Sequence, residues 1–376
     1  MFSDFNGNAD VVLRLREMLA RDRFPHSIIL AGPRGAGKYT LAQMVAKAMN
    51  CRRAGIARDD APMLLAPQPS LDLPDFCGEC ENCARITEAD DLDARCAEAV
   101  ETRESLRETD RKETRIFVQT HSDVLIIPPD PPQMMIKVDQ VRHVTATIYH
   151  RPTSGGRRVF IFTDSAFMKE AANALLKVLE EPPEFATIFL LTENPGELLP
   201  TIRSRCVTFT LAPLPVEEVE CFLAARRPEW NAAQRSVAAR LSGGAVGSAL
   251  TFDVASYTAA RNDALVLLRT ATGSDDHSSL FRVTETYRAG AEGRDKTERL
   301  LRTIYSLLED LLFLKSGTPD LVRNRDILGE LQRLAVNIDF TWIATAAMRL
   351  NEVETGMRRN LLRNVSLDAF ATSLAP

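Results

Sequence analysis

A glycine-rich segment followed by a lysine offers the clearest chemistry in the sequence. It reads GPRGAGKYT over residues 32–40, after an apolar run and before the helical pattern LAQMVAKAMN. Gly32, Gly35 and Gly37 let the backbone wrap a phosphate with its N–H groups pointing inward, and Lys38 adds a positive charge. A chance glycine-rich turn is the alternative. The setting of strand, loop and helix favours a phosphate loop that binds ATP or ADP.

The residues that should handle a metal ion depart from what a phosphate-loop ATPase needs. Tyr39 follows Lys38, at a position where a Ser or Thr hydroxyl binds Mg²⁺. Thr40 comes next, but on a helix its side chain points about 100° away. Asp164 ends the run VFIFT and is a candidate for metal binding or for a helix N-cap, and Ser165 replaces the expected general base. We expect a nucleotide site that includes Thr40 and Asp164, with Mg²⁺ binding left open and little hydrolysis.

Four cysteines are candidates for a metal site. Cys77, Cys80 and Cys83 are separated by two residues each, and Cys51 ends the helix that follows the phosphate loop. Four thiolates form the closed tetrahedral geometry of structural Zn²⁺, which leaves no open position for catalysis. A set of free thiols is the alternative, because the gap between Cys51 and Cys77 is longer than compact zinc modules use.

These residues need a scaffold, and the first half of the chain predicts a parallel sheet. Short apolar runs alternate with helical patterns, which is typical of strands covered by helices on both faces. We expect five strands, each rich in Val, Ile, Phe or Thr, over residues 28–31, 124–127, 159–163, 187–192 and 206–211.

Other segments mark an insertion and a domain boundary. Residues from about 51 to 120 carry the cysteines and then a charged stretch with few large apolar residues, for which we expect a solvated helix or a mobile insertion and assign no chemistry. Pro213 and Pro215 precede a region of helical patterns only. There Leu300, Ile304, Leu308 and Leu311 recur at helical spacing, so the last part of the chain predicts a helical bundle.

Composition narrows the function classes. A chain of 376 residues with 45% hydrophobic and 26% charged residues predicts a globular protein of two or three domains. A net charge of -5 argues against a protein that coats nucleic acid by itself. Since the sequence contains no apolar run of about 20 residues and does not start like a secretory signal, we expect a cytoplasmic protein without a membrane partner.

Several strings resemble the clamp-loader branch of the AAA+ family over about residues 10 to 255. They are FPHSIILAGPRGAGK, MMIKVDQVRHV, the cysteine cluster, AANALLKVLEEPP and TIFLLTENPGELLPTIRSRC. The resemblance implies an α/β AAA+ domain with a five-stranded parallel sheet at 1–212, a small helical lid at 213–254, and an all-α collar at 255–376. It also implies a structural zinc module at the four cysteines.

The resemblance further implies roles for single residues and partners. Arg205, in the string Ser204-Arg205-Cys206, resembles an arginine finger that reaches the ATP of a neighbouring subunit, although a surface ion pair is the alternative. The lid arginine of motor subunits is replaced by Gly247. Implied partners are gamma/tau and delta clamp-loader subunits in a hetero-pentameric ring, with the sliding clamp and primed DNA reached through the complex.

Two other functions remain open at this point. An ATPase motor of the same ring would favour Glu at position 165 and Arg at position 247, and the sequence has neither. A phosphate-loop kinase would explain neither the Ser204-Arg205-Cys206 string nor the helical last third. We therefore expect a ring member with weakened nucleotide chemistry that takes part in DNA replication.

Overall fold

The computed structural model describes residues 1–53, 73–273, 277–288, 291–358 and 361–374. These residues form two compact units. Unit 1 comprises Met1–Glu218 with Gly244–Ser248, and unit 2 comprises Val219–Gly243 with Ala249–Pro376. The expected division into domains at 1–212, 213–254 and 255–376 stays a prediction. Among the described residues, no helix has the length and apolar character needed to cross a membrane.

A six-stranded sheet organises unit 1, in the order β2-β3-β4-β5-β1-β6. The strands are β1 (Ser27–Ala31), β2 (Val118–His121), β3 (Val124–Ile127), β4 (Arg158–Phe162), β5 (Ala186–Thr192) and β6 (Val207–Thr210). β3, β4, β5, β1 and β6 are mutually parallel, which confirms the five predicted strands. The sequence analysis missed β2, a short antiparallel edge strand whose Gln, Thr and His lack the apolar signal of a buried strand.

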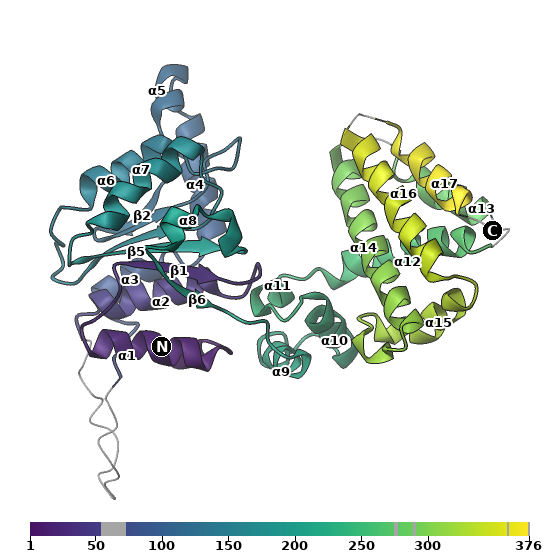
Figure 1. The fold of residues 1–376 in the computed structure, drawn as a ribbon, viewed down its shortest axis with the longest axis horizontal. Coiled ribbons are helices and arrows are strands. Elements are labelled where there is room, and N and C mark those ends of the chain that lie inside the picture. The colour runs from purple at the N-terminus through teal and green to yellow at the C-terminus, as the bar shows by residue number, and fades with distance from the viewer. Residues whose placement is uncertain (54–72, 274–276, 289–290, 359–360, 375–376) are drawn as a thin grey trace, which may run out of the picture. The chain divides into compact units, whose positions relative to one another are not determined.

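Helices cover both faces of the sheet (Figure 1). On one face lie α1 (Ala9–Ala20), α2 (Lys38–Asn50) and α3 (Glu81–Thr87), and on the other α6 (Val138–Thr147), α7 (Lys169–Glu180) and α8 (Pro200–Arg203). Along β1, Ile28 and Leu30 face the first core, whereas Ile29 and Ala31 face the second. This alternation within a wholly buried strand is why β1 reads as a continuous apolar run.

The charged part of the insertion is helical. It forms α4 (Leu92–Glu104), whose N-cap Asp91 accepts a hydrogen bond from the backbone N–H of Ala94, and α5 (Glu108–Glu113). Neither helix has a fully buried residue, so these are the solvated helices that the composition predicts. Residues 54–72, the earlier part of the predicted insertion, lie outside the described residues.

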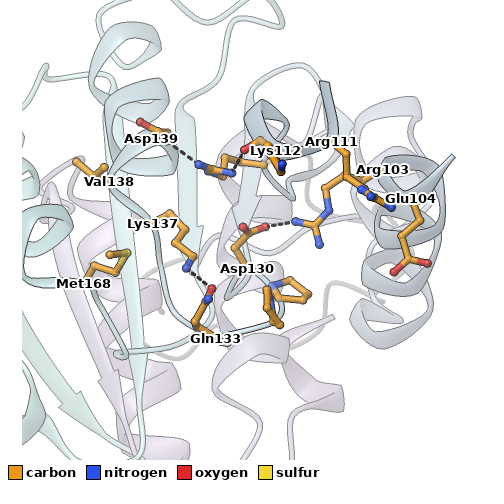
Figure 2. Close-up of a pocket in the computed structure, with 13 residues that line it drawn as sticks. Arg103, Glu104, Arg111, Lys112, Asp130, Gln133, Lys137, Val138, Asp139 and Met168 are labelled. Carbon is orange, nitrogen blue, oxygen red and sulfur yellow. Dashed lines mark hydrogen bonds and ion pairs between the residues drawn. The ribbon is translucent and has the colours of Figure 1, made fainter. Parts of the chain in front are cut away.

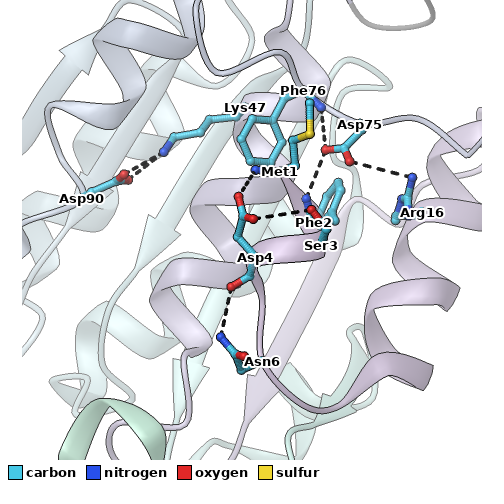
Figure 3. Close-up of polar contacts among 10 residues, drawn as sticks. All are labelled: Met1, Phe2, Ser3, Asp4, Asn6, Arg16, Lys47, Asp75, Phe76 and Asp90. Atoms are coloured by element: carbon cyan, nitrogen blue, oxygen red, sulfur yellow. Dashed lines mark hydrogen bonds and ion pairs between the residues drawn. The ribbon is translucent and has the colours of Figure 1, made fainter. Parts of the chain in front are cut away.

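A polar network ties the residues before Cys77 to the helices beneath them (Figure 3). The backbone N–H of Phe2 donates to the Asp75 carboxylate at 3.1 Å, and the ring of Phe2 meets the ring of Phe76 edge-on at 5.7 Å. Lys47 of α2 lies 5.9 Å from the centre of the Phe76 ring and donates to Asp90 at 2.8 Å. One lysine thus joins two segments to α2, the one before Cys77 and the turn before α4.

The described residues of unit 2 form helices joined by loops, without a strand. Unit 2, with the helices that cross its boundary, contains α9 (Val216–Arg226), α10 (Ala232–Leu241), α11 (Val246–Leu250), α12 (Val254–Ala271), α13 (His277–Glu285), α14 (Ala291–Lys315), α15 (Leu328–Val336), α16 (Phe340–Arg358) and α17 (Arg363–Ser373). The predicted stripe of Leu300, Ile304, Leu308 and Leu311 lies on α14 and is buried, which confirms the helical bundle. Buried Asp310 on α14 accepts hydrogen bonds from the backbone and the side chain of Asn324, at 3.1 and 2.7 Å.

The turn between β2 and β3 provides a test of stability. Asp123 is 2% exposed, and its carboxylate accepts hydrogen bonds from the backbone N–H groups of Thr153 and Ser154, at 3.0 and 2.8 Å. Burial opposes the charge, but these hydrogen bonds outweigh it and hold the pKa of Asp123 below its ordinary value. We expect Asp123→Asn to lower the free energy of unfolding by about 1–3 kcal/mol at neutral pH.

The pH dependence follows from the direction of this shift. A carboxyl whose pKa is depressed in the folded state stabilises the fold above its unfolded pKa of about 3.9, and this stabilisation is lost as the pH falls through the folded pKa. Urea unfolding, followed by circular dichroism, should therefore separate Asp123→Asn from the parent at pH 7, and the two should converge in acid. Asp22→Asn, a substitution of an exposed carboxylate, is the control. An equal difference at both pH values would contradict this account.

Candidate nucleotide-binding site and cysteine cluster

The predicted phosphate loop connects β1 to α2. Gly32, Gly35 and Gly37 have φ values of 148, 78 and 87°, which L residues rarely adopt. At Gly32 the space is also closed, since a Cβ there would lie 2.7 Å from the carbonyl oxygen of Leu211. The loop therefore occurs in the setting of strand and helix that the sequence predicts.

Lys38 closes the loop on itself. Its Nζ donates to the carbonyl oxygens of Gly32 and Pro33, at 2.6 and 2.9 Å. Burial lowers the pKa of Lys38, while the carboxylates of Glu193 and Asp164 oppose that shift. A phosphate oxygen would compete for the same ammonium group.

Tyr39 is turned away from the position of a metal ligand. Its hydroxyl donates to the carbonyl oxygen of Ala89 at 2.5 Å and accepts from Gln43 Nε2 at 2.6 Å. Burial raises the pKa of Tyr39, so the phenol stays neutral and remains a donor. Thr40 is exposed and lines the cavity. The residue that replaces the Mg²⁺ ligand thus ties α2 to the turn before α4.

Asp164 does not cap the helix that follows it, and its role in metal binding stays a prediction. Helix α7 begins at Lys169, so the N-cap interpretation of Asp164 is wrong; its carboxylate instead accepts from the backbone N–H of Ala166 at 2.8 Å. Ser165 Oγ donates to Glu197 Oε2 at 2.9 Å and accepts from Thr192 Oγ1 at 3.0 Å. A serine hydroxyl bound in this way cannot replace a general base.

A cavity of about 810 Å³ lies beside the phosphate loop. It brings together Gly35, Gly37, Lys38, Thr40 and Asp164, and this volume falls within the range of about 300–1,000 Å³ common for small-molecule sites. Other lining residues, which the sequence analysis did not single out, are Arg34, Leu92, Asp93, Cys96, Val100, Thr192, Glu193 and Glu197. Thr192, Glu193 and Glu197 could have been predicted from their position, because they lie at or just after the carboxyl end of β5. Ligands bind at this edge of parallel sheets.

Two observations bear on whether a nucleotide fits. The glycine backbone and Lys38 present donors to a phosphate, and the cavity has the necessary size. Tyr39 lines this space, but its hydroxyl already donates to the carbonyl oxygen of Ala89. The arrangement can hold phosphate groups, but it lacks one of the side chains that position Mg²⁺ for hydrolysis.

The lid position predicted to lack an arginine packs directly on the phosphate loop. The backbone N–H of Gly247 donates to the Gly35 carbonyl oxygen at 2.8 Å, and Ser248 Oγ donates to the Arg34 carbonyl oxygen at 2.9 Å. A Cβ on Gly247 would lie 2.8 Å from the Gly35 carbonyl oxygen. A side chain at position 247 has no room in this arrangement.

Arg205 lies at the other end of the sheet. It precedes β6, the edge strand, whose Val207 pairs with Ile28 near the start of β1, whereas the phosphate loop leaves the carboxyl end of β1. Its guanidinium is one-third exposed and bonds to the Glu180 carboxylate at 2.7 Å and to the Thr201 carbonyl oxygen at 2.9 Å. Within this chain Arg205 therefore forms a surface ion pair and is remote from Lys38.

The four predicted cysteines form one cluster. Their Sγ atoms all lie within 4.8 Å of one another, and Sγ of Cys51 is 3.6 Å from Cys77 and 3.9 Å from Cys80. Sulfurs bound at about 2.3 Å around a tetrahedral Zn²⁺ would lie about 3.8 Å apart, so the spacing fits this ion. Cys80 and Cys83 are buried, and backbone N–H groups of Cys77 and Cys80 point at Sγ atoms of Cys51 and Cys77.

Comparison with known proteins gives a consistent set of relatives. Residues 7–215 match the family described as DNA polymerase III, delta subunit. DNA polymerase III subunit delta' of Escherichia coli K12 is 34% identical over 217 residues, which are 57% of this chain and 62% of the relative. The Pseudomonas aeruginosa subunit delta' is 30% identical over 52% of this chain and 45% of its own length.

Relatives of a second type match at slightly lower identity. DNA polymerase III subunit tau of E. coli is 27% identical over 58% of this chain and 26% of its own length. Among solved structures, a DNA polymerase III gamma subunit-related protein from Thermotoga maritima is 18% identical, with a TM-score of 0.39 over 96% of this chain and 99% of that one. The chain thus spans less than two thirds of the delta' relatives' lengths and about a quarter of tau's.

The contact between Gly247 and Gly35 generates a prediction. In a helix, Gly→Ala ordinarily stabilises by about 0.5–1 kcal/mol, and Gly247 does not need a left-handed φ. We nevertheless expect Gly247→Ala to loosen the phosphate loop, because the added methyl would force the Gly35 carbonyl away. Amide hydrogen exchange of a peptide covering residues 32–38 should accelerate.

Gly329→Ala is the matched control, because it is also helical and nothing lies within 4 Å of its added Cβ. It should leave exchange at residues 32–38 unchanged. Slower exchange at these residues in Gly247→Ala would show that helix propensity outweighs the contact.

Proposed function

The chain belongs to the family described as DNA polymerase III, delta subunit, and on that premise we propose that it is a delta-prime-type member of a clamp-loader ring. In this role it hydrolyses little or no ATP itself. Its Arg205 acts as an arginine finger on the ATP of a neighbouring subunit while the sliding clamp is loaded onto primed DNA. The neighbours would be gamma/tau and delta subunits in a hetero-pentameric ring.

The hydrogen bond from Tyr39 to Ala89 is the observation that carries this proposal. A motor subunit needs a short hydroxyl after the loop lysine to hold Mg²⁺ against the phosphates. Here that position holds a phenol whose hydroxyl donates to the backbone carbonyl oxygen of Ala89, in the turn before α4. The phosphate loop can therefore retain a nucleotide as a structural ligand while its hydrolysis stays slow.

Two further contacts support the proposal that ATP hydrolysis at this site is slow. Ser165 stands where a general base is expected, and its hydroxyl is occupied by Glu197 and Thr192. Gly247 lies against Gly35 with no space for the arginine that a motor's lid provides. Loss of the metal ligand, the base and the lid cation each removes stabilisation of the transition state for phosphoryl transfer.

Arg205 is proposed to act outside its own chain. A guanidinium is always charged, and its planar fork matches phosphate oxygens, so it suits stabilisation of charge that develops on a transferred phosphoryl group. In the isolated chain this group is held by Glu180 at the sheet edge, away from Lys38. An exposed ion pair of this kind contributes only about 0–1 kcal/mol, so assembly could exchange it for a partner's phosphate at small cost.

An active motor subunit is the second candidate, because relatives named tau match at 27% identity. The two functions depend on different residues of the chain. A motor depends on its own Lys38, whereas the proposed ring member depends on Arg205. Their variants therefore give opposite results.

We also propose that the cysteine cluster holds structural Zn²⁺. The ion would supply a closed cross-link between the end of α2, the segment at Cys77 and the start of α3. The Asp75 and Phe76 contacts already hold this segment against Phe2 and Lys47. The metal would therefore stabilise the base from which the insertion starts.

The function is tested by Arg205→Ala and Lys38→Ala in reconstituted clamp-loader complexes. Arg205→Ala should leave folding and assembly intact but reduce DNA-stimulated ATP hydrolysis and clamp loading, by about 10³-fold or more at the one site that the finger serves. Lys38→Ala should have a much smaller effect. The isolated chain should show no turnover near the 1–10³ per second common among enzymes.

Glu180→Gln is the matched control, because it removes the partner of Arg205 without touching the guanidinium. It should keep full activity in the complex. If it reproduces the Arg205→Ala defect, Arg205 acts only through its ion pair. Loss of loading in Lys38→Ala but not in Arg205→Ala would identify a motor.

Elemental analysis of purified protein tests the zinc site, and we expect one Zn²⁺ per chain. Cys80→Ser should lose the ion and speed hydrogen exchange in α3, because three thiolates bind it less tightly and folding is coupled to binding. Cys221→Ser, at an exposed cysteine outside the cluster, should keep it. Zinc retained in full by Cys80→Ser would refute the assignment.

A further inference from the structure

A second cavity of unit 1 lies between the insertion and the loop that leads from β3 to α6 (Figure 2). It has a volume of about 530 Å³, and we call it the insertion cavity. Its wall includes Arg103 of α4, Arg111 and Lys112 of α5, Arg115 after α5, and Lys137 before α6. Cations from four separate segments thus converge on one space.

Most acidic groups at the cavity are already used. Buried Asp130 receives Arg103 Nη1 at 2.8 Å and the backbone N–H of Ile116 at 3.3 Å. Asp139 receives Arg115 Nη2 at 2.9 Å. Glu104 is the remaining carboxylate of the wall, and it is exposed.

Lys112 pairs with Glu108 at 2.7 Å, but two other cations of the wall have no acidic partner among the described residues. Lys137 Nζ donates only to the neutral side-chain oxygen of Gln133, and the Arg111 side chain has no partner within the part of the chain that the structure describes. The Nε atoms of Arg103 and Arg115 are buried and lack an acceptor among the described residues. Because these Nε atoms are buried, the unpaired donors open to a ligand in the cavity are those of Arg111 and Lys137.

We propose that the insertion cavity binds phosphate groups. A phosphate supplies several strong acceptor oxygens and negative charge, and guanidinium forks match its geometry. Arg111 and Lys137 are the primary contacts, and the Arg103–Asp130 ion pair forms part of the cavity wall. The phosphates come from a free nucleotide or from a nucleic acid backbone.

This site is separate from the phosphate loop. It shares Pro131 with the nucleotide cavity, but it contains no residue of the loop and neither Asp164 nor Glu197. The inference therefore does not depend on the proposed function. It gives the charged insertion a role, since α4 and α5 provide three of the five cations.

The test uses the full chain in a Lys38→Ala background, which removes phosphate binding at the loop. Pyrophosphate, ADP and short single-stranded oligo(dT) are titrated by calorimetry. We expect saturable binding of pyrophosphate at one site, weakened at least about tenfold by Arg111→Ala with Lys137→Ala and weakened by added salt. Glu104→Gln should tighten it, because a like charge leaves the cavity wall.

Arg107→Ala is the matched control, since Arg107 is an exposed arginine of the same insertion that does not line the cavity. It should leave the affinity unchanged. Binding of ADP and pyrophosphate alone identifies a nucleotide source, and tighter oligo(dT) binding that depends on Arg111 identifies a nucleic acid backbone. The proposal is wrong if none of the probes binds in the Lys38→Ala background, or if the paired substitution changes affinity no more than Arg107→Ala does.

Discussion

The hydrogen bond from the Tyr39 hydroxyl to the Ala89 carbonyl oxygen connects the main features of unit 1. It takes the residue after the loop lysine away from the phosphates, and it fastens α2 to the turn that begins α4. Lys47 and Asp90 make a second link about two turns further along α2. Because the phenol is buried and neutral, it satisfies a backbone oxygen that would otherwise lie against α2 without a donor.

The position of α4 follows from this anchor, and α4 borders both cavities. Leu92, Cys96 and Val100, four residues apart, turn one face to the nucleotide cavity, while Arg103 reaches the insertion cavity and pairs with Asp130. Gly247 closes the phosphate loop from another side. These contacts hold the residues around the phosphate loop together, which is consistent with the slow hydrolysis proposed for this chain.

Much of the fold could be read from local pattern. β1, β3, β4 and β5 are apolar because parallel strands inside a sheet are buried on both faces, whereas the edge strand β6 buries only Phe209 and was recognised from its Val, Phe and Thr residues. Each of the five was predicted to within one residue at either end. β2 was missed because an edge strand needs only half of its side chains buried, and its Gln119 and Thr120 read as loop. The N-cap alternative for Asp164 is wrong because the chain makes an extra turn before α7.

The sequence by itself determined the phosphate loop and the group Cys77, Cys80 and Cys83, since both depend on residue types at short, fixed spacing. Cys51 lies 26 positions before Cys77 and joins this group only in the folded chain. Tertiary structure alone decided that Tyr39 faces Ala89, that Gly247 lies on Gly35 and that Arg111 shares a cavity with Lys137. In the first two pairs the residues lie 50 and 212 positions apart in the sequence. Contacts at such separations exist only after the sheet forms, because the packing of helices on its faces, and not local propensity, brings these residues together.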